Sequence, residues 1–409
     1  MPVTTTFNSA EGGPSTASAD VRALLRSIRS LRPVLAANGL EDDRVGRDTA
    51  PNMALLAEAG ANRLLVPAGY GGLWDGSTFG GFGALIRAET EIGAGDGPTC
   101  QNWGTTGLVS REIFDQGNGL PEETRQEIAR RLLHEGLRMV ASNAETGVAG
   151  SGPVVARPVP GGVVLSGTKS FNTNSGGLGL ANVGCVLEGS PGRHHVLVEL
   201  SHPDVEFHDD WDNMGQRGTC SQTLTYHDIF VADGWHYPGH APSPLFFGAV
   251  MLLHSGLLQG IGDGALDAMA SYVRTLKRGT LPQFATAADD PLILRRIGEV
   301  SSRLAASRAL LYATADLLEQ CGEEQGEIAA VTVDGFRAKA ACVEAALAAA
   351  GAVHEVAGAR ATAGKFGLDR FWRNARTFAS HDPTDAKNTY VGAYEVSGEL
   401  PQASSFLRA

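Results

Sequence analysis

The sequence predicts an α+β protein in which two helical regions flank a central β domain. Residues 19–136 and 244–409 repeat apolar residues at the three- and four-residue steps that are typical of helices. Residues 137–243 instead alternate β-branched residues with Gly, Pro and Asp turns, as short strands do. Because the strands are grouped together and do not alternate with helices, a doubly wound parallel sheet is not expected.

The N-terminal helical domain is expected over residues 19–136, after a short disordered tail at residues 1–18. The tail is polar and small and lacks the apolar core of a signal peptide. The first helix is predicted to end at Asn38-Gly39, because glycine readily adopts the left-handed conformation that closes a helix. The last helix is predicted to follow Pro121 and two acidic residues, and to end at Gly136.

The central domain is expected over residues 137–243 as a compact, barrel-like β domain. Its strands are predicted within 161–175, 181–188, 194–200 and 222–231, where β-branched and aromatic residues lie between turn residues.

The C-terminal region, residues 244–409, is expected to form a four-helix bundle followed by a tail that contributes to the interface and to the ligand site. Long helices are predicted at 292–321 and 333–359, where alanines allow helices to approach closely. The apolar stretch 245–266 contains His254, Asp263 and five glycines, so we expect a buried helix and not a membrane span.

Composition excludes several classes of function. The chain has 409 residues and a net charge of −12, so neither nucleic acid nor an anionic membrane is an expected partner. The five cysteines are widely spaced, without a Cys-x-x-Cys pair, which argues against a disulfide framework or a zinc site and favours a reduced, cytoplasmic protein. The histidines, including the pair His194-His195, form no metal-like pattern, so no metal is assigned.

Residues 369–387 concentrate basic and aromatic side chains around His381. Guanidinium groups suit phosphate or carboxylate binding, aromatic rings suit a flat conjugated ligand, and histidine moves protons near neutral pH. Arg370, Arg373 and Arg376, spaced by three, lie near one face of a helix and are assigned to the scaffold and to an interface.

Three motifs resemble the acyl-CoA dehydrogenase superfamily: SNAETGVAGSG at 142–152, LSGTKSFNTNS at 165–175 and NMGQRGTCSQTLTYHDIFV at 213–231. The segments 272–279 and 289–305, with the C-terminal segment, are similar to its flavin-dependent monooxygenase branch. The glutamate base of the dehydrogenases has no counterpart here, where the chain reads His381-Asp382-Pro383. The resemblance implies a helical–β–helical fold, a reduced flavin and O2.

The resemblance places Asn143 and Thr173 beside the reactive edge of the flavin. There an amide and a hydroxyl can hydrogen-bond oxygen bound to the flavin without adding charge. Ser142 and Ser175 take this role if the alignment shifts by one or two residues. The alternative interpretation is structural, with Asn143 capping a turn and Thr173 as an ordinary strand residue.

Other residues of the implied flavin site follow from the same motifs. Phe171 and Trp211 are expected to pack on the ring system, and Ser151 and Ser221 to bind its phosphate or ribityl groups. Trp103, in TCQNWGTTG, is assigned to the substrate cavity. For the aromatic residues the alternative is ordinary core packing.

Arg278 and Arg360 match positions whose side chains reach the phosphates of the cofactor, often across a subunit interface. Surface salt bridges are the alternative. Gly358 belongs to the glycine turn of the same region. Here His354-Glu355 precede Ala357-Gly358, where the dehydrogenases commonly have a glutamine that contacts FAD. The choice between FAD and FMN therefore stays open.

His381 is the principal catalytic candidate, as a group that takes a proton from the substrate or returns one during oxygen transfer. A histidine held by backbone in a tight Asp-Pro turn is the alternative. The glycine-rich stretch GLWDGSTFGGFG lacks the strand–helix context of a nicotinamide site. A separate NAD(P)H-dependent flavin reductase is therefore expected as a partner.

Together these features predict a two-component flavin-dependent monooxygenase, expected as a homotetramer or dimer, that acts on an aromatic or heteroaromatic small molecule. Hydroxylation of an indole-like ring is favoured, and N-oxidation or S-oxidation remains open. The rival functions are an acyl-CoA dehydrogenase or oxidase and a non-catalytic flavin-binding relative.

Overall fold

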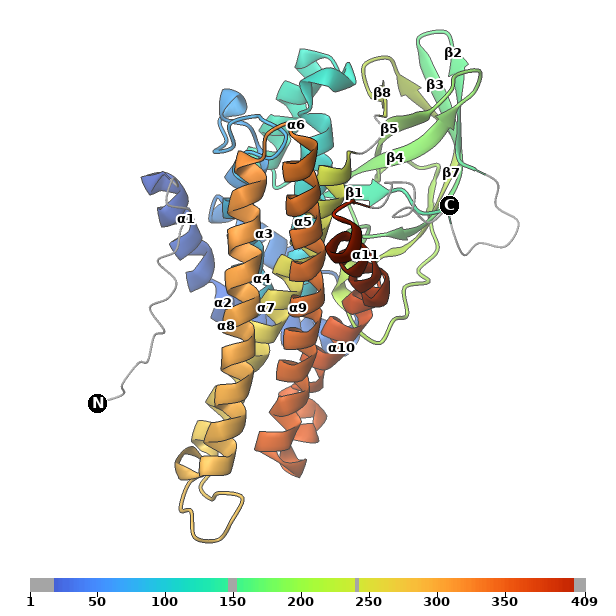
Figure 1. Ribbon diagram of the computed structural model, residues 1–409. Coiled ribbons are helices and arrows are strands. Elements are labelled where there is room, and N and C mark those ends of the chain that lie inside the picture. Colours follow the sequence, from blue (N-terminus) through green and yellow to red (C-terminus); the bar gives the residue numbers. More distant parts are fainter. Residues whose placement is uncertain (1–17, 146–152, 240–242, 401–409) are drawn as a thin grey trace.

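The computed structural model describes residues 18–145, 153–239 and 243–400. Along the chain a β region lies between two helical regions, and in space it lies to one side of the helices (Figure 1). The helices are α1 Ala19–Ser30, α2 Arg32–Val45, α3 Ala50–Glu58, α4 Phe82–Gly95, α5 Gly97–Ile113, α6 Glu122–His134, α7 Pro244–Thr275, α8 Pro291–Gln320, α9 Gln325–Ala357, α10 Asp369–Ala379 and α11 Thr384–Ser397. The strands are β1 Met139–Ser142, β2 Val155–Val159, β3 Gly162–Asn172, β4 Leu180–Leu187, β5 Arg193–Glu199, β6 Val205–Phe207, β7 Gln222–Ala232 and β8 His236–Pro238.

The strands form one mixed sheet in the order β6-β7-β3-β2-β4-β5-β8, with β1 paired to β4. The pairs β1–β4 and β2–β4 are parallel, and the other pairs are antiparallel. Among the described strands the path ends at β6 and β8, so the sheet has two edges where a barrel-like domain was expected. Its core is formed by alternating side chains, among them Val163, Leu165, Val196, Val198 and Leu224.

Three long helices, α7, α8 and α9, form the C-terminal bundle, and α4 from the N-terminal region packs against both α7 and α8. Helices α10 and α11 pack on α9 (Figure 1). Each of the helices α7 and α8 begins with a capping side chain and a proline. Ser243 accepts a hydrogen bond from the Phe246 amide at 3.3 Å, and Asp290 accepts one from the Leu292 amide at 2.9 Å.

Helix α7 confirms the buried helix predicted at 245–266. Helices α7 and α9 are long and apolar enough to cross a membrane by length and composition, but 78% of the most apolar window of α7 is buried inside the protein. Glycines let the two helices touch: a Cβ on Gly248 would lie 3.1 Å from the Cα of Thr332, and one on Gly262 would lie 3.1 Å from the Cα of Ala346.

The predicted end of the first helix at Asn38-Gly39 is wrong. The chain breaks earlier, at Leu31 between α1 and α2, and α2 runs through Gly39 to Val45, where Gly46 caps the helix with a φ of 66°. Gly39 serves close packing, because a Cβ there would lie 2.2 Å from Asp96 Oδ1. Residues 1–17 of the predicted tail lie outside the described residues, and Ser18 caps α1.

A buried polar cluster around Asn174 fixes the end of β3 against α5. Asn174 is buried with a φ of 79°, and its Nδ2 donates to the Met139 carbonyl at 3.0 Å and to Thr106 Oγ1 at 3.2 Å. Arg138 Nε donates to Asn174 Oδ1 at 2.8 Å, and Arg138 Nη1 pairs with Asp48 at 2.7 Å. The residues next to Asn174 are thereby held at a fixed distance from the N-terminal helices.

Glu89 of α4 is an acidic side chain inside the helical core, with an exposed fraction of 2%. Its carboxyl lies between two glycines: a Cβ on Gly104 would come within 2.3 Å of Oε1, and one on Gly256 within 2.8 Å of Oε2. Oε2 has no hydrogen-bond partner among the described residues. Burial therefore raises the pKa of Glu89 well above its usual value of 4.5.

We expect Glu89→Gln to raise the free energy of unfolding by at least about 1 kcal/mol at pH 8. Because the pKa of Glu89 is raised by folding, the wild-type protein loses stability as the pH rises from about 4.5 towards the folded pKa. The difference in the free energy of unfolding between variant and wild type should therefore grow with pH. Denaturant unfolding between pH 5 and 8.5 measures this difference.

Glu91→Gln, two residues along the same helix, is the matched control. Glu91 pairs with Arg29 at 3.1 Å and Arg32 at 2.7 Å, so its loss should lower stability by about 1 kcal/mol. A decrease in stability for Glu89→Gln that does not vary with pH would contradict the buried, protonated state.

Candidate active site

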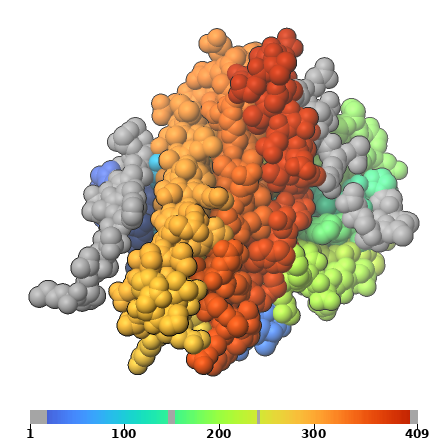
Figure 2. All heavy atoms as spheres, turned by 60° about the horizontal axis from the view of Figure 1, so that its bottom comes forward, coloured from blue at the N-terminus to red at the C-terminus, as the bar shows by residue number. Residues whose placement is uncertain are grey.

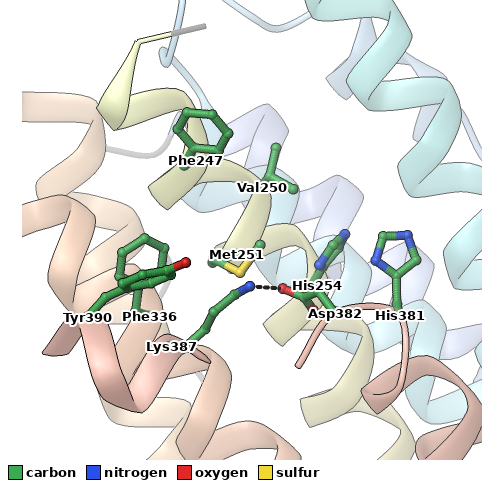
Figure 3. Close-up of a pocket in the computed structure, with 9 residues that line it drawn as sticks. All are labelled: Phe247, Val250, Met251, His254, Phe336, His381, Asp382, Lys387 and Tyr390. Atoms are coloured by element: carbon green, nitrogen blue, oxygen red, sulfur yellow. Dashed lines mark ion pairs between the residues drawn. The ribbon is translucent and has the colours of Figure 1, made fainter. Parts of the chain in front are cut away.

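Two cavities meet at His381, in the turn between α10 and α11. The first, of about 1110 Å³, lies against the sheet and is called the sheet cavity; its wall includes Gln101, Asn143, Lys169, Phe171, Thr173, Arg193, Trp211, Gln216, Ser221 and His381. The second, of about 180 Å³, lies between α7, α9 and α11 and is called the helix cavity (Figure 3); it is lined by Phe247, Val250, Met251, His254, Phe336, His381, Asp382, Lys387 and Tyr390.

Phe171 projects into the sheet cavity from an irregular part of β3. The pairing of β3 with β7 shifts between Lys169 and Asn172, and Phe171 within that bulge has a φ of 54°, a strained value for an aromatic residue. Its side chain is 57% exposed and meets Trp211 edge to face at 6.3 Å. Trp211 is anchored by its ring nitrogen, which donates to the Gln216 carbonyl at 3.0 Å. The two predicted aromatics thus form one wall.

A chain of hydroxyl and amide groups crosses the sheet cavity. Thr173 Oγ1 lies 2.9 Å from Ser221 Oγ and accepts from Gln101 Nε2 at 3.3 Å. Gln216 Nε2 in turn donates to Gln101 Oε1 at 2.8 Å. Thr173 and Ser221 were predicted from motifs that lie some fifty residues apart, and the fold brings them together. Gln101 and Gln216 were missed, because neither residue stands out in the sequence from other polar residues.

Asn143 lies at the edge of the sheet cavity and accepts a hydrogen bond from Arg193 Nη2 at 2.6 Å. The bond uses the oxygen of the Asn143 carboxamide, so its N–H groups are what it can offer to a ligand. Gly184 makes room for the pair, since a Cβ there would lie 2.3 Å from Arg193 Nη2. Sequence reasoning missed Arg193, which lies in an ordinary strand pattern.

Lys169 is a second cation that the sequence did not reveal. Only 1% of the residue is exposed, and its ammonium pairs with Glu145 at 2.5 Å in the wall of the sheet cavity. Burial lowers the pKa of Lys169, although Glu145 favours the charged form. The ion pair ties β3 to the segment after β1 that carries Asn143.

Three predicted residues lie elsewhere or outside the description. Ser142 is fully buried, with its hydroxyl 2.6 Å from Asn172 Oδ1 and 2.9 Å from the Tyr226 hydroxyl, and it lines neither cavity. Trp103 is also fully buried, donates to Asn62 Oδ1 at 3.1 Å and lines neither cavity, so the structure places it in the core. Ser151 lies outside the described residues.

The alternative donor Ser175 donates to the Cys220 carbonyl at 2.8 Å and does not line the sheet cavity.

Arg278, Gly358 and Arg360 lie together at the other end of the bundle from the sheet. Arg278 follows α7 and the other two follow α9, and all three are exposed. Figure 2 shows the segments after α7 and after α9 next to one another, and a contact between the rings of Tyr272 and Phe366 at 5.1 Å joins them. None of the three lines the sheet cavity of its own chain.

His381 is exposed at the junction of the two cavities. Its ring lies 4.8 Å from the ring of His254 and 5.7 Å from that of Phe378. Burial, together with the nearby positive charge of Lys339, lowers the pKa of His254 well below its usual value, so its ring is neutral.

Asp382, beside His381, pairs with Lys387 at 2.6 Å and with Lys339 at 3.5 Å (Figure 3 shows the pair with Lys387). Burial opposes the charged carboxylate, but the two lysines hold the pKa of Asp382 well below its usual range. His254, His381 and Asp382 could together reach a metal ion, with ligand atoms within 4.8 Å of one another. A cation there would compete with the two lysines for the carboxylate.

Two of the three arginines of α10, Arg370 and Arg373, belong to the scaffold, and Arg376 is exposed. Arg373 pairs with Asp43 at 2.5 Å and with Asp369 at 2.8 Å, and it donates to the Met214 carbonyl at 2.7 Å. Arg370 is buried.

Comparisons with known proteins agree with this arrangement. Residues 252–386 match the family described as acyl-CoA dehydrogenase, C-terminal domain. A dibenzothiophene monooxygenase from Rhodococcus qingshengii is 31% identical over 400 residues, covering 91% of this chain and 93% of the relative. A probable FMNH2-dependent monooxygenase, SfnC from Pseudomonas putida, is 28% identical over 94% of this chain and 98% of its own length.

A solved structure of TdsC from Paenibacillus sp. A11-2, in complex with FMN and indole, has the same fold. It superposes with a TM-score of 0.82 at 23% identity, covering 94% of this chain and 100% of that chain.

We expect Gly184→Ala to weaken flavin binding by about tenfold, since the new Cβ would separate Arg193 from Asn143, and a charge-assisted hydrogen bond contributes about 1.5–3 kcal/mol. Titration calorimetry of the two proteins measures it. Gly177→Ala is the control, because a Cβ there has no atom within 4 Å. Equal affinities for both variants would show that the Asn143–Arg193 contact does not shape the flavin site.

Proposed function

Because the chain belongs to the dibenzothiophene monooxygenase family and is a flavin-dependent oxidoreductase, we propose that it oxygenates an indole-like heteroaromatic molecule with reduced FMN and O2. Reduced flavin comes from a separate reductase, as the relation to an FMNH2-dependent monooxygenase implies.

The observation that carries this proposal is the convergence of Phe171, Thr173, Trp211 and Ser221 in one cavity with His381 at its rim. The donor set fits a flavin: two aromatic side chains offer a flat wall, and hydroxyl and amide groups offer both donors and acceptors to a ring rich in nitrogen and oxygen. The cavity volume of about 1110 Å³ exceeds the usual range for one drug-sized ligand, so it leaves room for a flavin.

A bound reduced flavin would supply the two electrons that let O2 give one oxygen atom to the substrate and the other to water, leaving oxidised flavin. The protein's own part is to hold the ring, exclude water and place donors where negative charge develops. Phe171 and Trp211 close one side of the cavity. Thr173, held between Ser221 and Gln101, and Asn143, held by Arg193, present the donors.

His381 supplies the proton transfer in this proposal. Its imidazole faces both cavities, so it can reach the substrate and the flavin side of the site. An imidazole nitrogen can take a proton from the substrate as oxygen is added and give it back as water leaves.

The helix cavity supports an uncharged aromatic substrate. Besides two histidines and the Asp382–Lys387 ion pair, its lining is apolar or aromatic: Phe247, Val250, Met251, Phe336 and Tyr390. Its volume of about 180 Å³ suits a small ring system against His381. TdsC was solved with both FMN and indole, which supports an indole-like ring. S-oxidation of a thiophene is the second candidate, because the 31% identical relative is a dibenzothiophene monooxygenase. The apolar side chains of the helix cavity favour an indole or a thiophene over an amino sugar as the substrate.

The positions of Arg278, Gly358 and Arg360 support a homo-oligomer. If these residues bind cofactor phosphate, they do so for a neighbouring copy, since they lie away from the sheet cavity of their own chain. FMN is favoured over FAD for two reasons. SfnC is described as FMNH2-dependent and TdsC was solved with FMN bound, and this chain lacks a glutamine before Ala357-Gly358.

Reconstitution with a flavin reductase, NADH, FMN and O2 tests the proposal. Indoles, thiophenes, phenols and amino sugars are offered separately, and the products are identified by mass spectrometry with 18O2. We expect a substrate of the indole class to give a product that carries one labelled oxygen atom. Oxidation of an acyl-CoA with an artificial electron acceptor and without O2 would overturn the proposal in favour of a dehydrogenase.

We expect Thr173→Val to weaken FMN binding or to lower product yield per reduced flavin by about tenfold, because the loss of one such donor costs about 1.5–3 kcal/mol. Thr168→Val is the control: it removes a hydroxyl of β3 that bonds Thr225 at 2.9 Å and does not line the cavity. If both variants behave alike, Thr173 is an ordinary strand residue.

We expect His381→Ala to keep FMN affinity within about threefold of wild type and to lower product yield at least tenfold, since general acid–base groups contribute about 10²–10⁴-fold. The reducing equivalents should appear as hydrogen peroxide, measured with a peroxidase assay. An unchanged ratio of product to hydrogen peroxide would remove His381 from the reaction.

A further inference from the structure

A lysine with no exposed surface lies behind the turn that carries His381. Lys339 is in the middle of α9 with an exposed fraction of 0%, and its ammonium lies 3.5 Å from Asp382 Oδ1 and 4.9 Å from the centre of the Phe378 ring. Its Nζ has no hydrogen-bond partner among the described residues. Burial lowers the pKa of Lys339 to about 8, even though Asp382 favours the charged form.

Burial of this ammonium opposes folding, so packing alone does not explain it. Removing an ammonium from water costs several kcal/mol unless a counter-ion compensates for it. The compensating group is Asp382, the residue directly after His381. Lys387 of α11 approaches the same carboxylate at 2.6 Å (Figure 3). One carboxylate therefore connects α9 to α11 at the base of the turn.

The opposite side of His381 is bounded by α7. The His254 ring meets both His381, at 4.8 Å, and Phe378, at 5.0 Å, with interplanar angles of 71° and 84°. Because His254 is neutral, it bounds the His381 ring by contact and adds no charge to it. Helices α7, α9 and α11 thus each contribute a side chain, His254, Lys339 and Lys387, that contacts the segment His381-Asp382.

We infer that Lys339 and Lys387, acting through Asp382, are positioning residues that hold His381 at the junction of the two cavities. This inference rests on the proposed function, in which His381 moves a proton between substrate and flavin. Neither lysine lines the sheet cavity, and both act through the carboxylate of Asp382. Their loss should therefore change the orientation of His381 while the flavin-side donors stay in place.

The test compares Asp382→Asn, Lys339→Met and the double variant. Asp382→Asn leaves the buried ammonium of Lys339 without a counter-ion, so stability should fall, whereas Lys339→Met leaves Asp382 paired with Lys387 and should cost less. The double change also removes the buried ammonium, so it should recover part of the stability lost in Asp382→Asn. If the ion network positions His381, the double variant should still lose product yield at least tenfold, with hydrogen peroxide rising. If the network is only structural, product yield recovers together with stability, and the inference is overturned.

A second measurement needs no flavin or substrate. Hydrogen–deuterium exchange of the protein alone reports on residues 380–387, and we expect exchange there to increase at least tenfold in all three variants. Exchange in β3 and β4 should stay as in wild type. Unchanged exchange in 380–387 would contradict the inference whatever the activity.

Asp263→Asn is the matched control. Asp263 pairs with Arg308 at 2.6 Å inside the same bundle, away from His381, so its loss should lower stability without changing the ratio of product to hydrogen peroxide. If the wild-type protein forms no oxygenated product but exchange at residues 380–387 still increases in the variants, the proposed function fails while the ion network is still shown to hold the turn.

Discussion

The site depends on one buried amide, that of Asn174. Its side chain bonds the last residues of β3 to α5 and β1, and its backbone adopts a left-handed conformation that turns the chain there. Thr173 precedes it and Phe171 lies three residues before it, so the hydrogen bonds of Asn174 fix the positions at which both residues enter the sheet cavity. Gln101, which contacts Thr173, belongs to the helix on which Asn174 is fixed. Without that bond the sheet and the helices would each fold, but the polar chain across the cavity would have no defined span.

Much of the fold could be predicted from sequence, because apolar periodicity and turn residues act locally. The long helices α8 and α9 and the strands β3, β4, β5 and β7 lie where the patterns indicate. Gly39 was misread because a glycine at a helix end and a glycine that admits a neighbouring aspartate look identical in sequence. The same limit applies to Gln101, Arg193 and Lys169. Their roles come from partners brought close by the fold, and a polar residue in a regular pattern carries no sign of that.

Charge in the site is arranged in pairs. Lys169 with Glu145, and Asp382 with its two lysines, tie segments of different elements together on either side of the cavity. Arg193 bonds an amide and not a carboxylate, so it adds positive charge beside Asn143. These pairs fix the supporting segments, and they share the cavity walls with neutral hydroxyl, amide and aromatic groups.

The two cavities also divide the chain along its length. Apart from the His381 turn and the end of α10, the named wall of the sheet cavity comes from residues 101–221, whereas the helix cavity is built from residues 247–390. Recombination with a relative at the boundary before α7 would therefore exchange the apolar wall and keep the flavin-side wall intact. In such a library, substrate range could be varied by truncating Phe336 or Tyr390 without rebuilding the cofactor site.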